Sequence, residues 1–277
     1  MKFGFVLPKG DARIAAEFAL QAEQSGWDGF FVWEPVWGID AWICLTAAAM
    51  VTERIKLGTM LTPLSRMRPW KLASETATLD NLSRGRVILS VGLGAVNTGF
   101  EDFGEITDRK TRAELLDEGL EILTNLWTGK PFLHAGKHYQ VKITEKTFQP
   151  PPSPIQKPRI PVWVVGAWPS TKSMNRVLHY DGLLPAVLGE DGKVRLDMIT
   201  PDEINEMKQF INASHDQATP FDIIMEGQTP GDDPQKAGTI VSSYRDVGVT
   251  WWIEALWEMQ ETEAVLTRIK QGPPPVE

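Results

Sequence analysis

Cysteine is almost absent from this sequence, because Cys44 is the only one among 277 residues. A single cysteine excludes an internal disulfide and every zinc or iron–sulfur site that needs several cysteines. The four histidines are not spaced as metal ligands, and no HExxH, GxSxG or P-loop pattern occurs. We therefore expect no metal in the functional site.

Positive charge is also scarce. Lys and Arg number 28 against 36 Asp and Glu, which gives a net charge of −8 and a pI near 5.2. A nucleic-acid-binding surface needs an excess of Lys and Arg, so no nucleic-acid partner is expected. The longest uncharged stretch, 87–100, is shorter than the roughly 18 residues that span a bilayer, and the N-terminus lacks a secretory signal. We expect a soluble, cytoplasmic protein without a membrane partner.

The composition is otherwise that of a globular protein, with 42% hydrophobic and 23% charged residues. Short apolar runs typical of buried strands alternate with segments of helical periodicity. The expected strands are 3–7, 29–33, 55–61, 86–92, 161–166, 181–187, 221–227 and 249–255. The expected helices are one capped by Asp11, followed by 41–52, 69–82, 111–127, 170–179, 201–214, 234–247 and 261–271. This alternation predicts an α/β fold, a (β/α)8 barrel, with a doubly wound open sheet as the alternative.

The stretch 128–160 departs from the alternation, and we expect it to be an insertion before the fifth strand. It contains His134, His138 and Tyr139 in a short β-like stretch, followed by a dense group of prolines from 150 to 161. Prolines at this density favour an extended connector over a core element. We therefore expect a single domain over 1–277, whose insertion helps to shape the substrate pocket.

Active sites of such barrels lie where the strands end, so the residues that follow each apolar run are candidates. Glu34 directly follows the second run and is the best-placed acid; the alternative is a salt-bridged carboxylate at the rim. Glu226 and Glu254 also stand at strand ends. Several tryptophans near these ends favour a flat conjugated ligand, although filling of the barrel explains each of them equally well: Trp33, Trp37, Trp163, Trp168 and Trp252.

Two glycine-containing segments follow strands as well. The segment 166–170 joins a strand to a helix with proline in its first turn, and the Ser170 hydroxyl with free N–H groups favours phosphate binding there. Such junctions are also common without a ligand. The segment 92–94 contains half of a dinucleotide fingerprint, but Asn97 replaces the third glycine. A tight turn is therefore expected, and not a nicotinamide site.

Basic residues gather after the third and fourth strands. Arg66, Arg68 and Lys71 form the first cluster, and the second lies at 109–112. Either cluster suits an anionic cofactor tail, but a solvated rim is the favoured interpretation.

Several stretches together resemble the luciferase-like family of flavin-dependent oxidoreductases, which includes F420-dependent members. The most specific are ERIKLGT at 53–59, ATLDNLSRGR at 77–86 and PRIPVWVVG at 158–166. Further similarity at 103–104, 115–129, 136–139 and 180–182 extends the resemblance over nearly the whole chain. The resemblance implies a (β/α)8 barrel and a homodimer.

The resemblance also implies where a cofactor binds. The ring stacks over a bulge after the third strand, and the Met60–Leu61 peptide in that bulge is the candidate for a cis bond. The implied cofactor-binding residues are Thr59, Met60 and Leu61 in the bulge, Gly92, Leu93 and Gly94 along the ring, and Val165, Gly166, Ala167, Trp168 and Ser170 around the phosphate. Trp33, Trp37 and Trp168 are expected to shield the ring. The substrate pocket is expected to contain Trp33, Trp37, His138 and Tyr139.

Two positions depart from the family pattern. Many members have a histidine after the acid of the second strand, where this chain has Pro35. Bacterial luciferase has an arginine that contacts the flavin phosphate after the fourth strand, where this chain has Leu93. Phosphate binding must then rely on backbone amides or another basic residue, and Glu34 remains as acid, base or hydrogen-bonding anchor.

The hypothesis from the sequence is a luciferase-like monooxygenase that uses reduced FMN and O2 on a small organic substrate, with a separate flavin reductase as partner. The alternatives are an F420-dependent oxidoreductase that transfers a hydride and a flavin-binding barrel without turnover. An unrelated barrel enzyme of sugar or phosphate metabolism is weaker, because no paired acids with defined spacing occur.

Overall fold

Eight parallel strands close into a barrel in the computed structural model, which describes residues 1–145, 150–214, 220–259 and 261–276. Each strand pairs with the next, and the pairings of β3 with β5 and of β1 with β11 complete the ring. The barrel strands are β1 (Lys2–Leu7), β2 (Gly29–Val32), β3 (Lys56–Thr59), β5 (Val87–Gly92), β8 (Val162–Trp168), β9 (Gly182–Val187), β10 (Asp222–Gly227) and β11 (Trp251–Ala255). The predicted (β/α)8 barrel is confirmed, and the open sheet is wrong.

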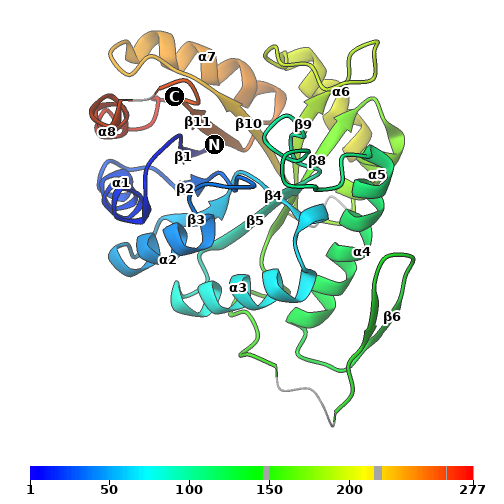
Figure 1. Cartoon of the computed structure of the whole chain (residues 1–277). Helices are drawn as coiled ribbons and strands as arrows, with labels where there is room; N and C mark the ends of the chain where they lie inside the picture. Colours follow the sequence, from blue (N-terminus) through cyan, green and yellow to red (C-terminus); the bar gives the residue numbers. More distant parts are fainter. Residues whose placement is uncertain (146–149, 215–219, 260, 277) are drawn as a thin grey trace.

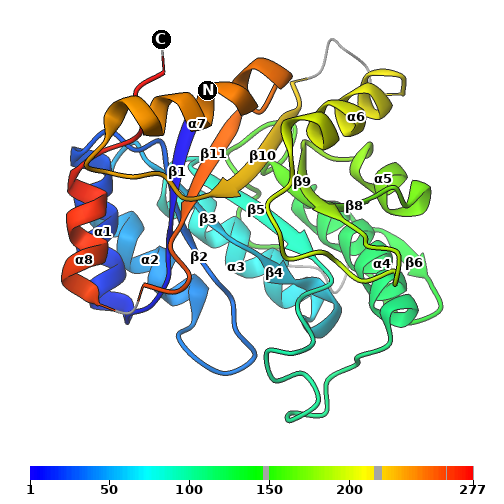
Figure 2. The same cartoon turned by 90° about the horizontal axis from the view of Figure 1, so that it is seen from above.

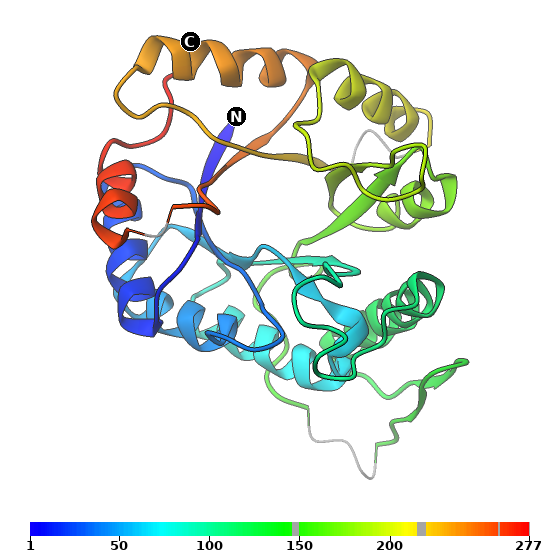
Figure 3. The same ribbon diagram turned by 45° about the horizontal axis from the view of Figure 1, so that its top comes forward.

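Helices surround the strands on the outside, as Figures 1 and 3 show. They are α1 (Ala12–Gln24), α2 (Ala41–Val51), α3 (Pro69–Leu82), α4 (Arg109–Trp127), α5 (Thr171–Val177), α6 (Pro201–Asn212), α7 (Pro234–Val247) and α8 (Thr262–Lys270), with a 3-10 turn η1 (Leu64–Arg66) before α3. Asp11 caps α1 as predicted, because its carboxylate accepts hydrogen bonds from the N–H groups of Arg13 and Ile14. Within the described ranges, none of these helices combines the length and apolarity needed to cross a membrane.

Large aromatic side chains fill the barrel opposite glycines. The rings of Phe31 and Trp163 lie 5.6 Å apart, and those of Trp163 and Trp251 lie 5.2 Å apart. A Cβ atom on Gly4 would lie 2.7 Å from Phe31, and one on Gly182 would lie 2.6 Å from Trp163. These positions therefore accept only glycine at this packing density.

Two tryptophans expected near the strand-end site lie elsewhere. Trp163 is fully buried inside the barrel, so the barrel-filling interpretation is correct for this residue. Trp252 is also fully buried, but its ring lies 5.4 Å from that of Tyr244 on α7, on the outer face of the strands. The alternation of side chains along a strand separates it from the interior residues Trp251 and Ile253.

The insertion contains an antiparallel hairpin, β6 (Leu133–Ala135) and β7 (Gln140–Lys142), which packs on the outer side of α4 (Figure 1). The Glu118 carboxylate of α4 accepts hydrogen bonds from the backbone N–H groups of Lys137, His138 and Tyr139. One carboxylate thus attaches the hairpin to the helix, because it satisfies the N–H groups of the hairpin turn.

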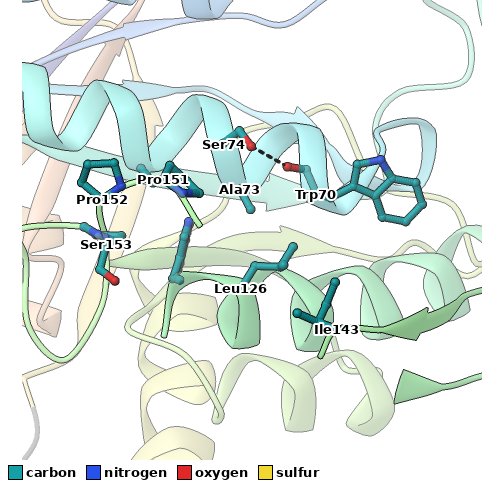
Figure 4. Close-up of a pocket in the computed structure, with 11 residues that line it drawn as sticks. Trp70, Ala73, Ser74, Leu126, Ile143, Pro151, Pro152 and Ser153 are labelled. Carbon is teal, nitrogen blue, oxygen red and sulfur yellow. Dashed lines mark hydrogen bonds between the residues drawn. The ribbon is translucent and has the colours of Figure 1, made fainter. Parts of the chain in front are cut away.

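The proline-rich segment after the hairpin returns along α3. Asp80 of α3 accepts hydrogen bonds from the N–H groups of Ile155 and Gln156. This segment, α3 and α4 enclose a cavity of about 250 Å3, lined by Trp70, Ala73 and Leu126 among others (Figure 4). No residue of a barrel strand lines this cavity, so it lies outside the ring of strands.

A buried arginine joins the start of β5 to the end of α2. Arg86, at the start of β5, is only 7% exposed. Its guanidinium donates to the carbonyl oxygens of Ser83, Ile55, Ala49 and Thr52 and to the Thr52 hydroxyl, at 2.8–3.0 Å. All three guanidinium nitrogens are therefore satisfied, and the last carbonyl groups of α2 find donors that the helix cannot supply.

We predict that Arg86→Met destabilises the fold by about 3 kcal/mol, because it leaves several buried carbonyl groups without donors. Urea denaturation of both proteins measures the difference. Arg13→Met, at an exposed position of α1, is the matched control and should change the free energy of unfolding by less than about 0.5 kcal/mol. Equal stabilities of the Arg86→Met variant and the wild type would contradict the proposed role of Arg86.

Candidate functional site

The carboxyl ends of the barrel strands and the loops after them form one end of the molecule, which we call the barrel mouth. The bulge expected there lies between β3 and β4 (Thr62–Pro63), and its Met60–Leu61 peptide is cis, as predicted. Met60 belongs to the cluster inside the barrel. A Cβ atom built on Gly92 would lie 3.2 Å from Leu61 and 2.8 Å from Val165. Three segments that the sequence associates with a cofactor therefore meet at one place.

Glu34 lies at one end of a chain of hydrogen-bonded hydroxyl groups. It follows β2 and is 9% exposed, and its carboxylate accepts a hydrogen bond from the Thr62 hydroxyl. The Thr62 and Thr59 hydroxyl oxygens are 2.9 Å apart, and the Thr59 hydroxyl donates to the carbonyl oxygen of Ser90 at 3.3 Å. This chain joins the ends of β2, β4, β3 and β5.

The alternative for Glu34, a salt-bridged carboxylate at the rim, is wrong. The neighbouring cation, Arg66, donates to the backbone carbonyls of Glu34 and Pro35 at 2.9 and 2.6 Å, and not to the carboxylate. Burial raises the pKa of Glu34 to about 7, while the Thr62 hydrogen bond and the charge of Arg66 oppose the rise. The carboxyl group is therefore present in both protonation states near neutral pH and can give or take a proton there.

Glu226 is a second acid of the barrel mouth. Ile224, two residues earlier on β10, lies inside the barrel, so Glu226 faces the same interior. The Trp257 indole donates to its carboxylate at 3.2 Å, and burial raises its pKa. The sequence placed Glu226 at the end of a strand but did not single it out as a site residue. The signal that could have done so is its position two residues after Ile224, because alternate side chains of a strand share one face.

Glu254, the third acid at a strand end, has a structural role. It is fully buried and accepts hydrogen bonds from the N–H and hydroxyl groups of Thr229, at 2.7 and 2.8 Å, and from the Trp252 indole. Arg268 of α8 lies 3.5 Å away as its counter-ion. Its partners belong to the outer layer, so Glu254 connects β11 to α8.

The segment 166–170 differs in detail from the expected phosphate site. β8 continues to Trp168, and Pro169 precedes the cap Ser170, so proline does not lie in the first turn of α5. The N–H of Ala167 donates to the Ser173 hydroxyl at 3.0 Å and is not free for a phosphate. A Cβ atom on Gly166 would lie 2.4 Å from Leu183, so this glycine permits close packing. The Ser170 hydroxyl accepts from the Ser173 N–H at 3.5 Å as the cap of α5, so the N–H groups of Thr171 and Lys172 remain for an anion.

Trp168 does not cover the barrel mouth, and the expectation that it shields a ring is wrong. Its indole donates to Glu206 of α6 at 3.1 Å, and its ring lies 6.0 Å from that of Phe210. Trp168 follows Val162 and Val164 on the outward face of β8, because side chains alternate along the strand.

The four residues expected in the substrate pocket fall into two groups. Trp33 and Trp37 lie on the loop after β2, at the barrel mouth, and are 38% and 82% exposed. His138 and Tyr139 lie on the hairpin outside α4, where the His138 ring is 2.9 Å from Glu114 and the Tyr139 ring is 6.1 Å from Trp70. Placing His138 and Tyr139 in the pocket is therefore wrong, because their insertion packs sideways on α4 and not over the strand ends.

Several buried polar atoms near the barrel mouth lack hydrogen-bond partners. They are the hydroxyl oxygens of Ser65 and Ser90 and the Nε atoms of Arg66 and Arg112. The Trp251 indole, at the start of β11, and the Trp42 and Glu75 side chains of α2 and α3 also have unpartnered buried atoms, so the mouth is not alone in this respect. Buried polar groups of folded proteins are normally paired, and those at the mouth could be paired by a ligand that carries polar groups. No group of three or more His, Cys, Asp or Glu residues that could hold a metal occurs in the described part of the chain.

Comparison with known proteins relates this chain to one family. The model of a family described as luciferase-like monooxygenase matches residues 1–199. An F420-dependent glucose-6-phosphate dehydrogenase of Amycolatopsis mediterranei is 28% identical over 230 residues, which cover 74% of this chain and 67% of that protein. The chain thus spans about two thirds of that curated relative, and the matches to two similar dehydrogenases cover 65% of each.

Solved structures share the fold at low identity. A monooxygenase from Streptomyces bottropensis superposes with a TM-score of 0.77 at 18% identity, over 98% of this chain and 97% of that one. An F420-dependent secondary alcohol dehydrogenase superposes with a TM-score of 0.75 at 16% identity, over 99% and 98%. These likenesses support the barrel architecture.

We predict that Glu34 makes the fold less stable as the pH rises. Its carboxyl ionises near pH 4.5 in the unfolded chain and near 7 in the fold, so the folded state holds a proton that the unfolded state releases between these values. Between about pH 5 and about pH 8, this residue should lower the free energy of unfolding by about 2–3 kcal/mol. Chemical denaturation of wild type and Glu34→Gln across this range should show the variant gaining stability relative to wild type. A pH-independent difference would contradict the raised pKa.

Proposed function

The chain belongs to the luciferase-like monooxygenase family, and from this we propose that it is an oxidoreductase whose flavin-type cofactor binds at the barrel mouth. The observation that supports the proposal is the buried Glu34 carboxyl, which has a pKa of about 7 and lies beside the bulge at the strand ends. A group present in both protonation states suits acid–base chemistry near neutral pH. The substrate is proposed to be a small organic molecule that enters beside Trp33 and Trp37.

We propose the deazaflavin F420 as the cofactor. The curated relatives include F420-dependent dehydrogenases that align with about three quarters of this chain. Reduced FMN is the second candidate, supported by the description of the family as monooxygenases. When bound, F420 supplies hydride transfer, and reduced FMN supplies the electrons that activate O2. A separate flavin reductase is a partner only in the second case.

The described residues fit such a group at three points. The bulge at Met60 and Leu61 offers an apolar support for a flat ring, and Gly92 lets Leu61 and Val165 pack closely beside it. Ser90 has an unpartnered hydroxyl one strand position below Gly92 in the interior row. The first turn of α5, capped by Ser170, offers N–H groups to a phosphate.

Glu34 is proposed to hold the proton that accompanies redox chemistry. In its protonated form it can donate to Thr62, Thr62 to Thr59, and Thr59 to the Ser90 carbonyl, so every hydroxyl of the chain finds an acceptor. In its ionised form it accepts from Thr62. Both states are therefore accommodated without movement of the backbone, and the carboxyl can exchange a proton with substrate. Glu226 is proposed as the second acid facing the substrate.

We also propose that residues 1–277 form one domain. A homodimer is a further part of the proposal. Helix α2 has no charged residue along its length and still presents exposed apolar side chains at Ile43, Met50 and Val51. Helix α3 adds exposed Trp70 and Leu82. A helix without charges is normally buried, which supports contact with a second copy over this face.

Anaerobic titration of the purified protein with F420, reduced FMN and oxidised FMN tests the choice of cofactor. We expect F420 to bind with micromolar affinity. The absorbance or fluorescence of F420 measures this binding. Glu34→Gln should bind F420 with similar affinity but lose about 100-fold or more in turnover, because general acid–base catalysis contributes about that much. Binding of none of the three by folded protein would contradict the proposed function, and exclusive binding of reduced FMN would favour the monooxygenase.

A charge placed at the cap of α5 tests the phosphate end. Ser170→Asp retains a capping side chain and adds a negative charge, so it should abolish cofactor binding by repulsion while the fold is kept. Ser170→Asn is the matched control, because it keeps a cap without adding charge. Equal affinity of the aspartate and asparagine variants for the cofactor in the same titration would contradict phosphate binding at the start of α5.

A further inference from the structure

The loop between β2 and α2 projects at the barrel mouth and carries the proposed acid (Figure 2). Within the described ranges, the hydrogen bonds that join residues 34–39 to other segments are those with Thr62 and Arg66. The Thr62 hydroxyl donates to the Glu34 carboxylate. Nη2 of Arg66 donates to the carbonyl oxygens of Glu34 and Pro35 at 2.9 and 2.6 Å. The segment after the bulge therefore holds the acid both by its side chain and by its backbone.

The segment that makes these contacts is itself anchored in the fold. Thr62 is fully buried and pairs with Val91 of β5. Leu64, which begins η1, is also fully buried, and a Cβ atom on Gly119 of α4 would lie 3.0 Å from it. Because β5 and α4 fix this segment, its contacts determine where the loop after β2 lies.

The hydrogen bonds of Arg66 differ from those of an arginine that stabilises the fold. The Arg86 guanidinium donates to carbonyl groups of several separate segments. In the described chain, the Arg66 guanidinium donates to the loop after β2 alone, and its Nε is buried without a partner. Loss of the Arg66 side chain would therefore release this loop and no other described segment.

The loop has little else to hold it in place. Trp33 and Trp37 are 38% and 82% exposed, so burial of these rings contributes little to its attachment. Pro35 has no backbone N–H to donate. A Cβ atom on Gly38 would lie 2.7 Å from the Pro35 ring, so the loop packs on itself and not on the barrel there. The contacts of Arg66 are therefore a main attachment of the loop to the fold.

We propose that Arg66 is a positioning residue of the reaction, which fixes the backbone at Glu34 and Pro35 and thereby holds the acid buried beside the bulge. This inference rests on the proposed function, in which Glu34 exchanges a proton with the substrate. Arg66 acts through the backbone, because its hydrogen bonds go to carbonyl oxygens and not to the carboxylate. The Thr62 hydroxyl then meets a carboxyl group whose place is already set.

The pKa of Glu34 reports whether this position is kept. Burial is the largest cause of the rise to about 7; the Thr62 hydrogen bond and the Arg66 charge oppose the rise, and the charges of Asp40 and Glu75 add to it. If Arg66 positions the loop, its removal admits water to the carboxyl, and the lost burial outweighs the lost charge. The pKa then falls toward 4.5. If Arg66 acted through its charge alone, its removal would raise the pKa.

Carbon NMR of the glutamate carboxyl groups, recorded against pH, measures this pKa in the protein without cofactor. The Glu34 signal is identified by its absence in Glu34→Gln. In Arg66→Met the signal should titrate at a pH lower by about 1 or more than in wild type. Arg68→Met is the matched control, because it removes the same charge two residues later, at an exposed position 5.8 Å from the Trp70 ring. It should leave the titration of Glu34 unchanged.

Arg66→Lys replaces the methionine variant if that variant does not fold. Lysine keeps the charge but has a shorter reach and no planar fork, so it should hold the loop less well and lower the pKa of Glu34 by a smaller amount. An unchanged or raised pKa in folded Arg66→Met, or in the lysine variant where methionine does not fold, overturns the inference. Titration of Glu34 near 4.5 in wild type also overturns it, because no buried acid is then held in place.

The outcomes distinguish this inference from the proposed function, which the cofactor titration tests separately. If wild type binds F420 or reduced FMN and Arg66→Met keeps the wild-type pKa of Glu34, the inference fails and the proposed function stands. If folded wild type binds neither cofactor, the proposed function fails, and with it the reaction in which Arg66 would position the acid.

Discussion

Closure of the barrel around three aromatic rings is the constraint on which the rest of the structure depends. Phe31, Trp163 and Trp251 fill the interior, and glycines such as Gly4 and Gly182 leave the space that the rings occupy. Because a close-packed interior tolerates neither a void nor an extra methyl group, neighbouring strands have a single register. That register determines where along the barrel axis each strand ends. It thereby brings Glu34, the bulge and Gly92 together at the barrel mouth.

Buried polar groups of the fold differ in how completely they are paired. Every guanidinium nitrogen of Arg86 and Arg268 has a carbonyl or hydroxyl partner, and Arg176 pairs with Asp117. The Ser90 hydroxyl, in contrast, has no partner, and neither has the Trp251 indole N–H at the start of β11. A fold normally pairs such groups, so we propose that the cofactor at the barrel mouth supplies the missing partner of Ser90.

Burial of the Glu34 carboxyl raises its pKa at the expense of stability. Desolvation raises its pKa to about 7, so at higher pH the fold must contain a charge that water would solvate better. Thr62, held in turn by Thr59, offsets part of this cost and gives the carboxyl a fixed direction. The same arrangement makes the carboxyl suitable for proton transfer near neutral pH.

The sequence by itself determined the order of strands and helices, and from this order the barrel was predicted, because hydrophobic periods and Pro or Gly positions act within a few residues. The resemblance to the family, and not a local period, predicted the cis Met60–Leu61 peptide. Glu34 as the acid of a site at the strand ends was also predicted from the sequence and stays a proposal. The bounds of α3 and α7 agree with the sequence to the residue. Tertiary structure alone decided that Trp163 points inward, that Trp168 faces α6, that the hairpin packs on α4 and that Arg66 donates to the backbone of Glu34. The physical reason is that a shift of one residue reverses the face of a strand side chain, and that docking and hydrogen bonding join residues far apart in the chain.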